Sequence, residues 1–173
     1  FTADDVTVAN GAIADLAVTS DAKVYTATYA PTAYVEDTTN VISVGTDWTD
    51  LAGNAPAASA TSSNYEVDTL APVLSTIVLS DTALNAGETA TVTFTFNEEV
   101  TNFTADDITV ANGTISDLTV TADTKIYTAI YTPTADVEDA TNVISVGTDW
   151  ADLAANTPAS SANSANYGVD TLR

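Results

Sequence analysis

Hydrophobic and polar residues alternate along several short stretches of this chain, which is the pattern of half-buried β-strands. The clearest case is residues 89–97, where Val92, Phe94 and Phe96 fall on one face and threonines fall on the other. Residues 125–131 alternate in the same way, and no long stretch carries the period of an amphipathic helix. The pattern therefore predicts an all-β protein with Val92, Phe94 and Phe96 in its core.

Turn signals separate these stretches and set the expected number of strands. Asn112-Gly113 predicts a tight turn with positive φ, the acidic run 136–139 predicts a loop, and residues 147–158 predict a long polar loop. The remaining expected strands are residues 74–80, 107–111, 114–121, 141–146 and 166–169. About seven short strands in about 100 residues are typical of an immunoglobulin-like antiparallel β-sandwich.

The sequence also repeats itself at a long period. Residues 103–172 repeat residues 1–70 at an offset of 102 positions, and about three-quarters of the paired residues are identical. A period of this length indicates whole domains in tandem. We therefore expect an incomplete repeat in residues 1–70, which lacks the first two strands, and a complete repeat in residues 71–173. This arrangement is what an excerpt from a longer array of repeats would show.

Composition narrows the possible functions. The chain has 24 acidic residues, 3 basic residues and no histidine, for a net charge of −21. This charge argues against binding to nucleic acid or insertion at an anionic membrane, and it suits solubility or divalent cations. The lack of cysteine excludes disulfides and thiolate metal sites.

Catalysis has little support in this sequence. Without histidine or cysteine, the commonest catalytic bases and nucleophiles are missing. The adjacent carboxylates of Asp106 and Asp107 would point to opposite faces of a strand, which does not suit a paired acid and base. We therefore expect that the protein is not an enzyme.

Four motifs carry a family resemblance: NEEV at residues 97–100, FTADDITVANG at 103–113, DLAGN at 50–54 and VDTLAP at 67–72. Together they resemble the bacterial Ig-like repeats of giant cell-surface and biofilm-associated adhesins, over essentially the whole chain. The resemblance implies an extracellular location, a role as an extender between domains, adjacent repeats as partners and, in several branches, calcium at domain junctions. It does not specify a distal ligand. The second copy of the DLAGN motif reads DLAAN at residues 152–156, so that its glycine is lost.

The expected topology gives a candidate calcium site. In a seven-stranded sandwich, the loops at residues 97–107 and 147–156 lie at the end where the incoming linker enters, and the preceding domain would present residues 36 and 37 in its fifth–sixth strand loop. Calcium takes six to eight oxygen ligands, and clustered carboxylates supply such ligands. The alternative is that these acids are ordinary loop residues that face water. The candidate ligands are Glu36, Asp37, Asp68, Glu98, Glu99, Asp106, Asp107, Asp149 and Asp152.

Aromatic residues give no separate binding site. Each copy has one tryptophan, Trp48 or Trp150, which we expect to close the end of the sandwich instead of stacking on a sugar. Tyr127 and Tyr131 share a strand face with Ala129, and we expect that face in the core. The leading interpretation is a structural extender. A module that binds a glycan or a cell surface, and an accessory domain of a secreted hydrolase, remain as alternatives.

Overall fold

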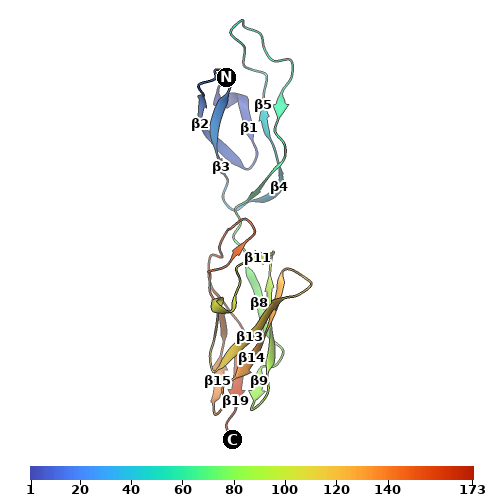
Figure 1. Ribbon diagram of the computed structural model, residues 1–173, viewed down its shortest axis with the longest axis vertical. Coiled ribbons are helices and arrows are strands. Elements are labelled where there is room, and N and C mark those ends of the chain that lie inside the picture. The colour runs from blue at the N-terminus through green and yellow to red at the C-terminus, as the bar shows by residue number, and fades with distance from the viewer. The chain divides into compact units, whose positions relative to one another are not determined.

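The computed structural model describes residues 1–173, which form two compact units, Phe1–Leu70 (unit 1) and Ala71–Arg173 (unit 2). Both units are built from short β-strands, and each has one short 3₁₀ turn (Figure 1). No helix in the chain has the length and apolar character that crossing a membrane requires.

Unit 2 contains the other expected strands together with several shorter ones, but the expected strand 141–146 is divided between β15 and β16, which belong to different sheets. Its elements are β8 (Leu74–Leu79), β9 (Ala83–Asn85), β10 (Ala90–Phe96), β11 (Val100–Thr101), the 3₁₀ turn η2 (Ala105–Asp107), β12 (Ile108–Val110), β13 (Gly113–Val120), β14 (Ile126–Pro133), β15 (Glu138–Asn142), β16 (Ile144–Val146), β17 (Ala151–Asp152), β18 (Ala162–Asn163) and β19 (Tyr167–Asp170).

These strands form a β-sandwich, as the sequence pattern predicts. One layer is the four-stranded sheet β13-β14-β10-β8, and the shorter sheets β12-β16-β18, β15-β19-β9 and β11-β17 supply the rest. Buried residues from both sets, such as Phe94 on β10, Val146 on β16 and Tyr167 on β19, belong to a single hydrophobic cluster. The core therefore lies between the long sheet and the shorter ones.

Strand β10 confirms the predicted assignment of faces. Val92 and Phe94 are completely buried and Phe96 is 3% exposed. The threonines between them are exposed or half-buried. The register places Phe94 opposite Tyr127 and Val92 opposite Ala129 on β14, so the predicted Tyr127 face also belongs to the core. Alternation succeeds here because successive side chains of a strand point to opposite faces.

Trp150 closes one end of this core, in agreement with its expected role. The indole is 2% exposed, and its ring centroid lies 4.9 Å from that of Phe96 in an edge-to-face arrangement. Its Nε1 donates a hydrogen bond of 2.9 Å to the carbonyl oxygen of Gly147. The polar atom of the ring is thereby satisfied while its apolar surface is buried.

The Asn112-Gly113 turn has the expected positive φ, but the two strands that it connects do not pair with each other. Asn112 has a φ of 52°, yet β12 pairs with β16 and β13 pairs with β14, so this turn carries the chain between sheets and does not form a hairpin. The Asn112 side-chain amide donates to Asp139 and Asn142 at 2.9 and 2.8 Å. These bonds hold the turn against β15, and local sequence cannot show them.

The acidic run at residues 136–139 was predicted to be a loop, and this prediction was wrong for its second half. Glu138 and Asp139 lie in β15, which pairs with β19. The Asp139 carboxylate accepts hydrogen bonds from Thr141 N and Oγ1 as well as from Asn112. A carboxylate with three donors can occupy a strand position that β-propensity alone disfavours.

Unit 1 repeats part of this design. It contains the 3₁₀ turn η1 and three small sheets, β1-β5-β6, β2-β3 and β4-β7, which correspond to β12-β16-β18, β13-β14 and β15-β19. It has no counterpart of β8 to β11. Its elements are η1 (Ala3–Asp5), β1 (Val6–Val8), β2 (Gly11–Val18), β3 (Tyr25–Pro31), β4 (Glu36–Asn40), β5 (Ile42–Val44), β6 (Ala60–Thr61) and β7 (Tyr65–Asp68).

Candidate functional site

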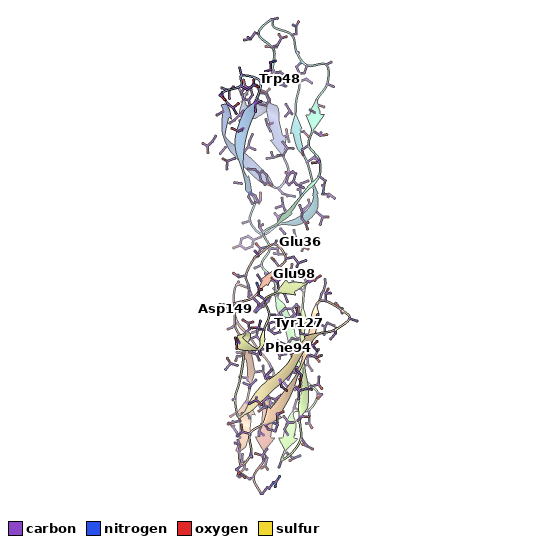
Figure 2. The ribbon with its side chains drawn as sticks, in the orientation of Figure 1. Glu36, Trp48, Phe94, Glu98, Tyr127 and Asp149 are labelled. Carbon is purple, nitrogen blue, oxygen red and sulfur yellow. The ribbon has the colours of Figure 1, made fainter.

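Two carboxylates from distant parts of unit 2 meet beside the short β11-β17 sheet. The register pairs Val100 with Asp152 and Thr101 with Ala151. Glu98 precedes β11 by two residues, and one of its carboxylate oxygens lies within 4.8 Å of one from Asp152 (Figure 2 labels Glu98). Strand pairing therefore brings together two acids that are more than fifty residues apart in the sequence.

Asp152 is held in place by its own loop. Its side chain is 1% exposed, and its two carboxylate oxygens accept hydrogen bonds from the backbone N–H and the side-chain amide of Asn156, each 2.8 Å long. Its own N–H donates to the carbonyl oxygen of Asn156 at 3.0 Å. The DLAAN segment is thus a closed loop that fixes the direction of one carboxylate.

The same loop forms in unit 1. The Asp50 carboxylate accepts hydrogen bonds from the backbone N–H and side-chain amide of Asn54 at 2.8 and 3.0 Å. The Asn54 side-chain bond is the largest of the effects that hold the pKa of the Asp50 carboxyl below its usual range. Asp50 is exposed, whereas Asp152 is buried. The loop is therefore a local property of the motif, and burial of its acid depends on β11.

The other candidates in unit 2 have different surroundings. The Asp107 carboxylate accepts hydrogen bonds from Thr104 N and Oγ1 at 2.7 and 3.1 Å and thereby caps η2. Glu99, Asp106 and Asp149 are exposed (Figure 2 labels Asp149). Within unit 2, the structure brings Glu98 and Asp152 together from the predicted set.

Glu36 and Asp37 lie on strand β4 and not on the expected fifth–sixth loop, so that part of the prediction was wrong. Glu36 begins β4 and stands directly opposite Asp68, which ends β7 (Figure 2 labels Glu36). Like charges directly opposite each other on adjacent strands repel, and a cation would offset that repulsion. Asp68 also accepts a hydrogen bond of 3.1 Å from the N–H of Leu70.

Asp37 has a structural role in β4. Its carboxylate accepts hydrogen bonds from Thr39 N and Oγ1 at 2.8 and 3.0 Å and from the Asn10 side-chain amide at 2.8 Å. These bonds, chiefly the one from the Thr39 N–H, hold the pKa of the Asp37 carboxyl below its usual range. Asp37 is the counterpart of Asp139 in unit 2, and both stabilise the Asn-Gly turn beside them.

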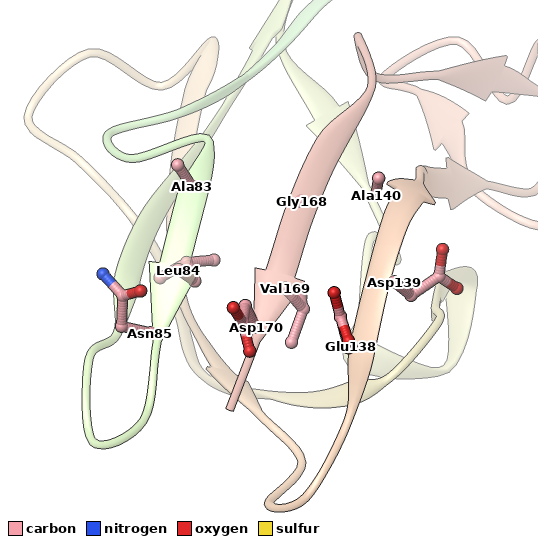
Figure 3. Close-up of a pocket in the computed structure, with 9 residues that line it drawn as sticks. All are labelled: Ala83, Leu84, Asn85, Glu138, Asp139, Ala140, Gly168, Val169 and Asp170. Carbon is pink, nitrogen blue, oxygen red and sulfur yellow. The ribbon is translucent and has the colours of Figure 1, made fainter. Parts of the chain in front are cut away.

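Sequence reasoning missed an acidic pocket in unit 2. Glu138 and Asp170 stand opposite each other on β15 and β19, and with Asn85 of β9 they line the pocket that Figure 3 shows. They occupy the same repeat positions as Glu36 and Asp68. The repeat offset, applied to those two candidates, would have identified both residues.

These side chains suit a hard cation. Carboxylate oxygens are the ligands that Ca²⁺ prefers, at about 2.3–2.6 Å, so two oxygens that share one ion lie at most about 5 Å apart. The separation of Glu98 and Asp152 meets this limit. The chain has no histidine or cysteine to supply the softer ligands that zinc or iron prefers.

Comparison with known protein families identifies the family to which both units are similar. A family model described as "Bacterial Ig-like domain" matches this chain twice, at residues 1–67 and at residues 68–169. No curated protein and no solved structure matches the sequence. The two matched segments together cover nearly all of the chain.

Proposed function

Because this chain belongs to the bacterial Ig-like domain family, we propose that it is a structural extender segment of a large secreted adhesin on a bacterial surface. The observation that carries the proposal is the tandem repetition of one domain with about three-quarters identity. Repetition adds length or valency, whereas a catalytic site is needed only once. In this role the chain holds a distal binding domain away from the cell, as in biofilm formation, and we assign it no catalytic step.

Calcium is the second part of the proposal. We propose that Glu98 and Asp152 bind a calcium ion, because strand pairing in unit 2 brings their carboxylate oxygens within 4.8 Å of each other. Asp68, which ends β7 and stands opposite another acid, Glu36, is a further proposed ligand. The fixed direction of the Asp152 carboxylate supports this assignment, because a preorganised ligand loses less entropy on binding. The bound calcium would neutralise the negative charge of these carboxylates and would stiffen the junction between repeats.

Calorimetry and small-angle scattering of the full chain, with calcium and with a chelator, test this part. Binding to the native state alone stabilises it by about 2.7 kcal/mol at a hundredfold excess over the Kd, so millimolar calcium should raise the melting temperature. Chelation should reduce the radius of gyration as the linker bends. Magnesium should act more weakly, because it requires tighter octahedral geometry and releases water reluctantly.

Matched variants identify the ligands. Glu98→Gln and Asp68→Asn should weaken the response to calcium, whereas Glu66→Gln, which removes a charge from an exposed position of β7, should preserve it. If melting and scattering curves with calcium and with chelator superimpose for the unsubstituted chain, the calcium assignment is wrong. An equal loss of response in all three variants would show a diffuse charge effect instead of a site.

The extender role has a separate test. The full chain should give no saturable binding on a glycan array or to whole cells, because an extender provides length without recognising a ligand. Specific, saturable binding would favour the alternative of a ligand-binding module. This outcome does not depend on whether calcium binds.

A further inference from the structure

The Asn112-Gly113 turn requires both of its residues. Asn112 has a φ of 52°, a backbone conformation that asparagine tolerates better than most residues. Gly113 cannot carry a side chain without movement, because an added Cβ would lie 2.5 Å from Cζ of Tyr131 and 2.6 Å from the carbonyl oxygen of Thr132. The fold therefore places asparagine directly before glycine, a residue with no side chain to shield its amide nitrogen.

This pair of residues can modify itself. The backbone nitrogen of Gly113 can attack Cγ of Asn112, because glycine has no Cβ to hinder the approach. The new N–Cγ bond forms as the Cγ–Nδ2 bond breaks, and Nδ2 leaves as ammonia with the proton that the Gly113 nitrogen gives up. Water then opens the five-membered imide at either of its C–N bonds, which yields aspartate or isoaspartate. The reaction consumes only water and changes no oxidation state.

Hydrogen bonds hold the reacting side chain in the folded protein. Asn112 Nδ2 donates to Asp139 Oδ2 at 2.9 Å and to Oδ1 of the buried Asn142 at 2.8 Å. The Asn112 carbonyl oxygen accepts hydrogen bonds from the Thr134 N–H at 2.8 Å and from the Tyr131 hydroxyl at 2.9 Å. Because both the side chain and the backbone are held, attack on Cγ requires the turn to open first.

The same contacts recur in unit 1. Asn10 has a φ of 49°, and its Nδ2 donates to Asp37 Oδ2 at 2.8 Å and to Asn40 Oδ1 at 2.7 Å. Its carbonyl oxygen accepts a hydrogen bond of 2.8 Å from the Tyr29 hydroxyl. The labile pair and the contacts that hold it are therefore a property of the repeat and not of one copy.

We propose that the Asn-Gly turn is a latent deamidation site, at Asn112 in unit 2 and at Asn10 in unit 1, which the folded repeat protects and which reacts when the repeat opens. The product would mark the repeat permanently. A carboxylate at position 112 would lose both donors and would stand against the Asp139 carboxylate, which the amide now contacts at 2.9 Å. Isoaspartate would also lengthen the backbone of the turn by one carbon.

A modified repeat would therefore not regain its native turn, so each opening that lasts long enough leaves a chemical record. This inference concerns a modification within the repeat. It does not depend on calcium or on the extender role, and its tests measure neither.

Peptide mass spectrometry of the full chain tests the protection. Conversion of the Asn112 amide to an acid should be at least about tenfold slower in native buffer than in guanidinium chloride, because the hydrogen bond to the Asp139 carboxylate alone favours the closed turn by about that factor. In the denatured chain, Gly113→Ala should slow the conversion, since its Cβ hinders attack. Equal rates for the native and denatured unsubstituted chain would overturn the proposal.

Matched variants test whether the hydrogen bonds give the protection. Asp139→Ala removes one acceptor of Asn112 and should speed conversion in native buffer by about tenfold or more. Glu138→Gln, at an exposed position of the same strand, should leave the rate unchanged. An unchanged rate in Asp139→Ala, or an equal acceleration in both variants, would show that these contacts do not protect the turn.

Refolding tests the permanence of the mark. In the full chain carrying Trp48→Phe, the 2% exposed Trp150 is the only tryptophan and reports on unit 2. After increasing times in guanidinium chloride, the fraction that regains native emission on dilution should fall in step with conversion of Asn112. Full recovery of native emission by converted chains would refute the permanent mark.

A substitution that imitates one product gives an independent check. Asn112→Asp should melt at a lower temperature than the unsubstituted chain. Asn102→Asp makes the same change at an exposed residue with a φ of 59° and should melt at nearly the unsubstituted temperature. If Asn112→Asp melts like the unsubstituted chain, or if both variants lose the same amount, the turn does not discriminate against the product and the proposal is wrong.

Discussion

Gly53 and Ala155 occupy the same position of one loop in the two units, and both have positive φ, 87° and 70°. An L-amino acid with a side chain is strained in this region, by about 1–2 kcal/mol, whereas glycine is not. The DLAAN loop therefore keeps the backbone of DLAGN despite the loss of its glycine, because Asp152 and Asn156 hold it closed.

Ala155→Gly should stabilise unit 2. Ala155 is exposed, so its methyl group contributes little packing, and relief of the strained φ exceeds the added flexibility of the unfolded chain. We expect a gain of about 0.5–1 kcal/mol in the free energy of unfolding, measured by chemical denaturation of the full chain. Gly53→Ala should have the opposite sign in unit 1. A loss of stability in Ala155→Gly would show that the methyl group makes a contact of its own.

Phe94→Ala should strongly destabilise unit 2. Phe94 is completely buried and its ring centroid lies 5.4 Å from that of Phe103, so truncation removes burial and leaves a cavity. The expected cost is about 3–5 kcal/mol, measured by denaturation of unit 2 within the full chain. Thr91→Ala, at an exposed position of the same strand, should cost less than about 1 kcal/mol. Similar costs for the two variants would contradict the assignment of faces in β10.

Gly113→Ala should also be destabilising, through overpacking. An added Cβ would lie 2.5 Å from Cζ of Tyr131 and 2.6 Å from the carbonyl oxygen of Thr132, and the backbone oxygen cannot move aside easily. We expect a cost of about 2–3 kcal/mol in thermal or chemical unfolding.

Two other glycines serve as controls for this prediction. Gly147→Ala should be nearly neutral, because the nearest atom to its added Cβ is the Asp107 carbonyl oxygen at 3.7 Å. Gly11→Ala, the equivalent change in unit 1, should also be destabilising, because its added Cβ would lie 2.5 Å from Cζ of the half-buried Tyr29. A neutral Gly113→Ala would mean that the turn can move away from Tyr131.

Acid should destabilise unit 2 through Asp139. Hydrogen bonds from the Thr141 N–H, the Thr141 hydroxyl and Asn112 hold the pKa of the Asp139 carboxyl below its usual range. A carboxyl whose pKa is lower in the folded than in the unfolded state stabilises the fold above the unfolded pKa, about 3.9, and this stabilisation is lost as the pH falls through the folded pKa. We expect the melting temperature to fall steeply below about pH 4.

Asp139→Asn isolates this contribution. The variant should melt at a lower temperature at neutral pH, and its melting temperature should fall less between about pH 5 and about pH 3 than that of the unsubstituted chain. Thermal melts followed by circular dichroism at several pH values measure both effects. Parallel pH profiles for the two proteins would show that other carboxylates, such as the similarly bonded Asp37, account for the acid sensitivity.

The candidate site shows how far sequence reasoning reaches. It selected Glu98 and Asp152 because both lie on loops that the sandwich topology assigns to one end, and the structure places their carboxylate oxygens within 4.8 Å. It did not separate them from Asp107, because the hydrogen bonds that engage that carboxylate in a cap depend on the backbone of η2. Residue type and loop position give the candidates, and only coordinates show which of their carboxylates lie close together.

The repeat, the β-class and the buried face of β10 could all be predicted from the sequence, because identity between copies and alternation along a strand need no distant partner. Tertiary structure alone decided that β12 pairs with β16 across the Asn112 turn, and that Glu138 and Asp139 extend as a strand. It also decided that Tyr131 is buried while Tyr29 is partly open. Each of these depends on contacts between segments far apart in sequence, and such contacts exist only once the sandwich has closed.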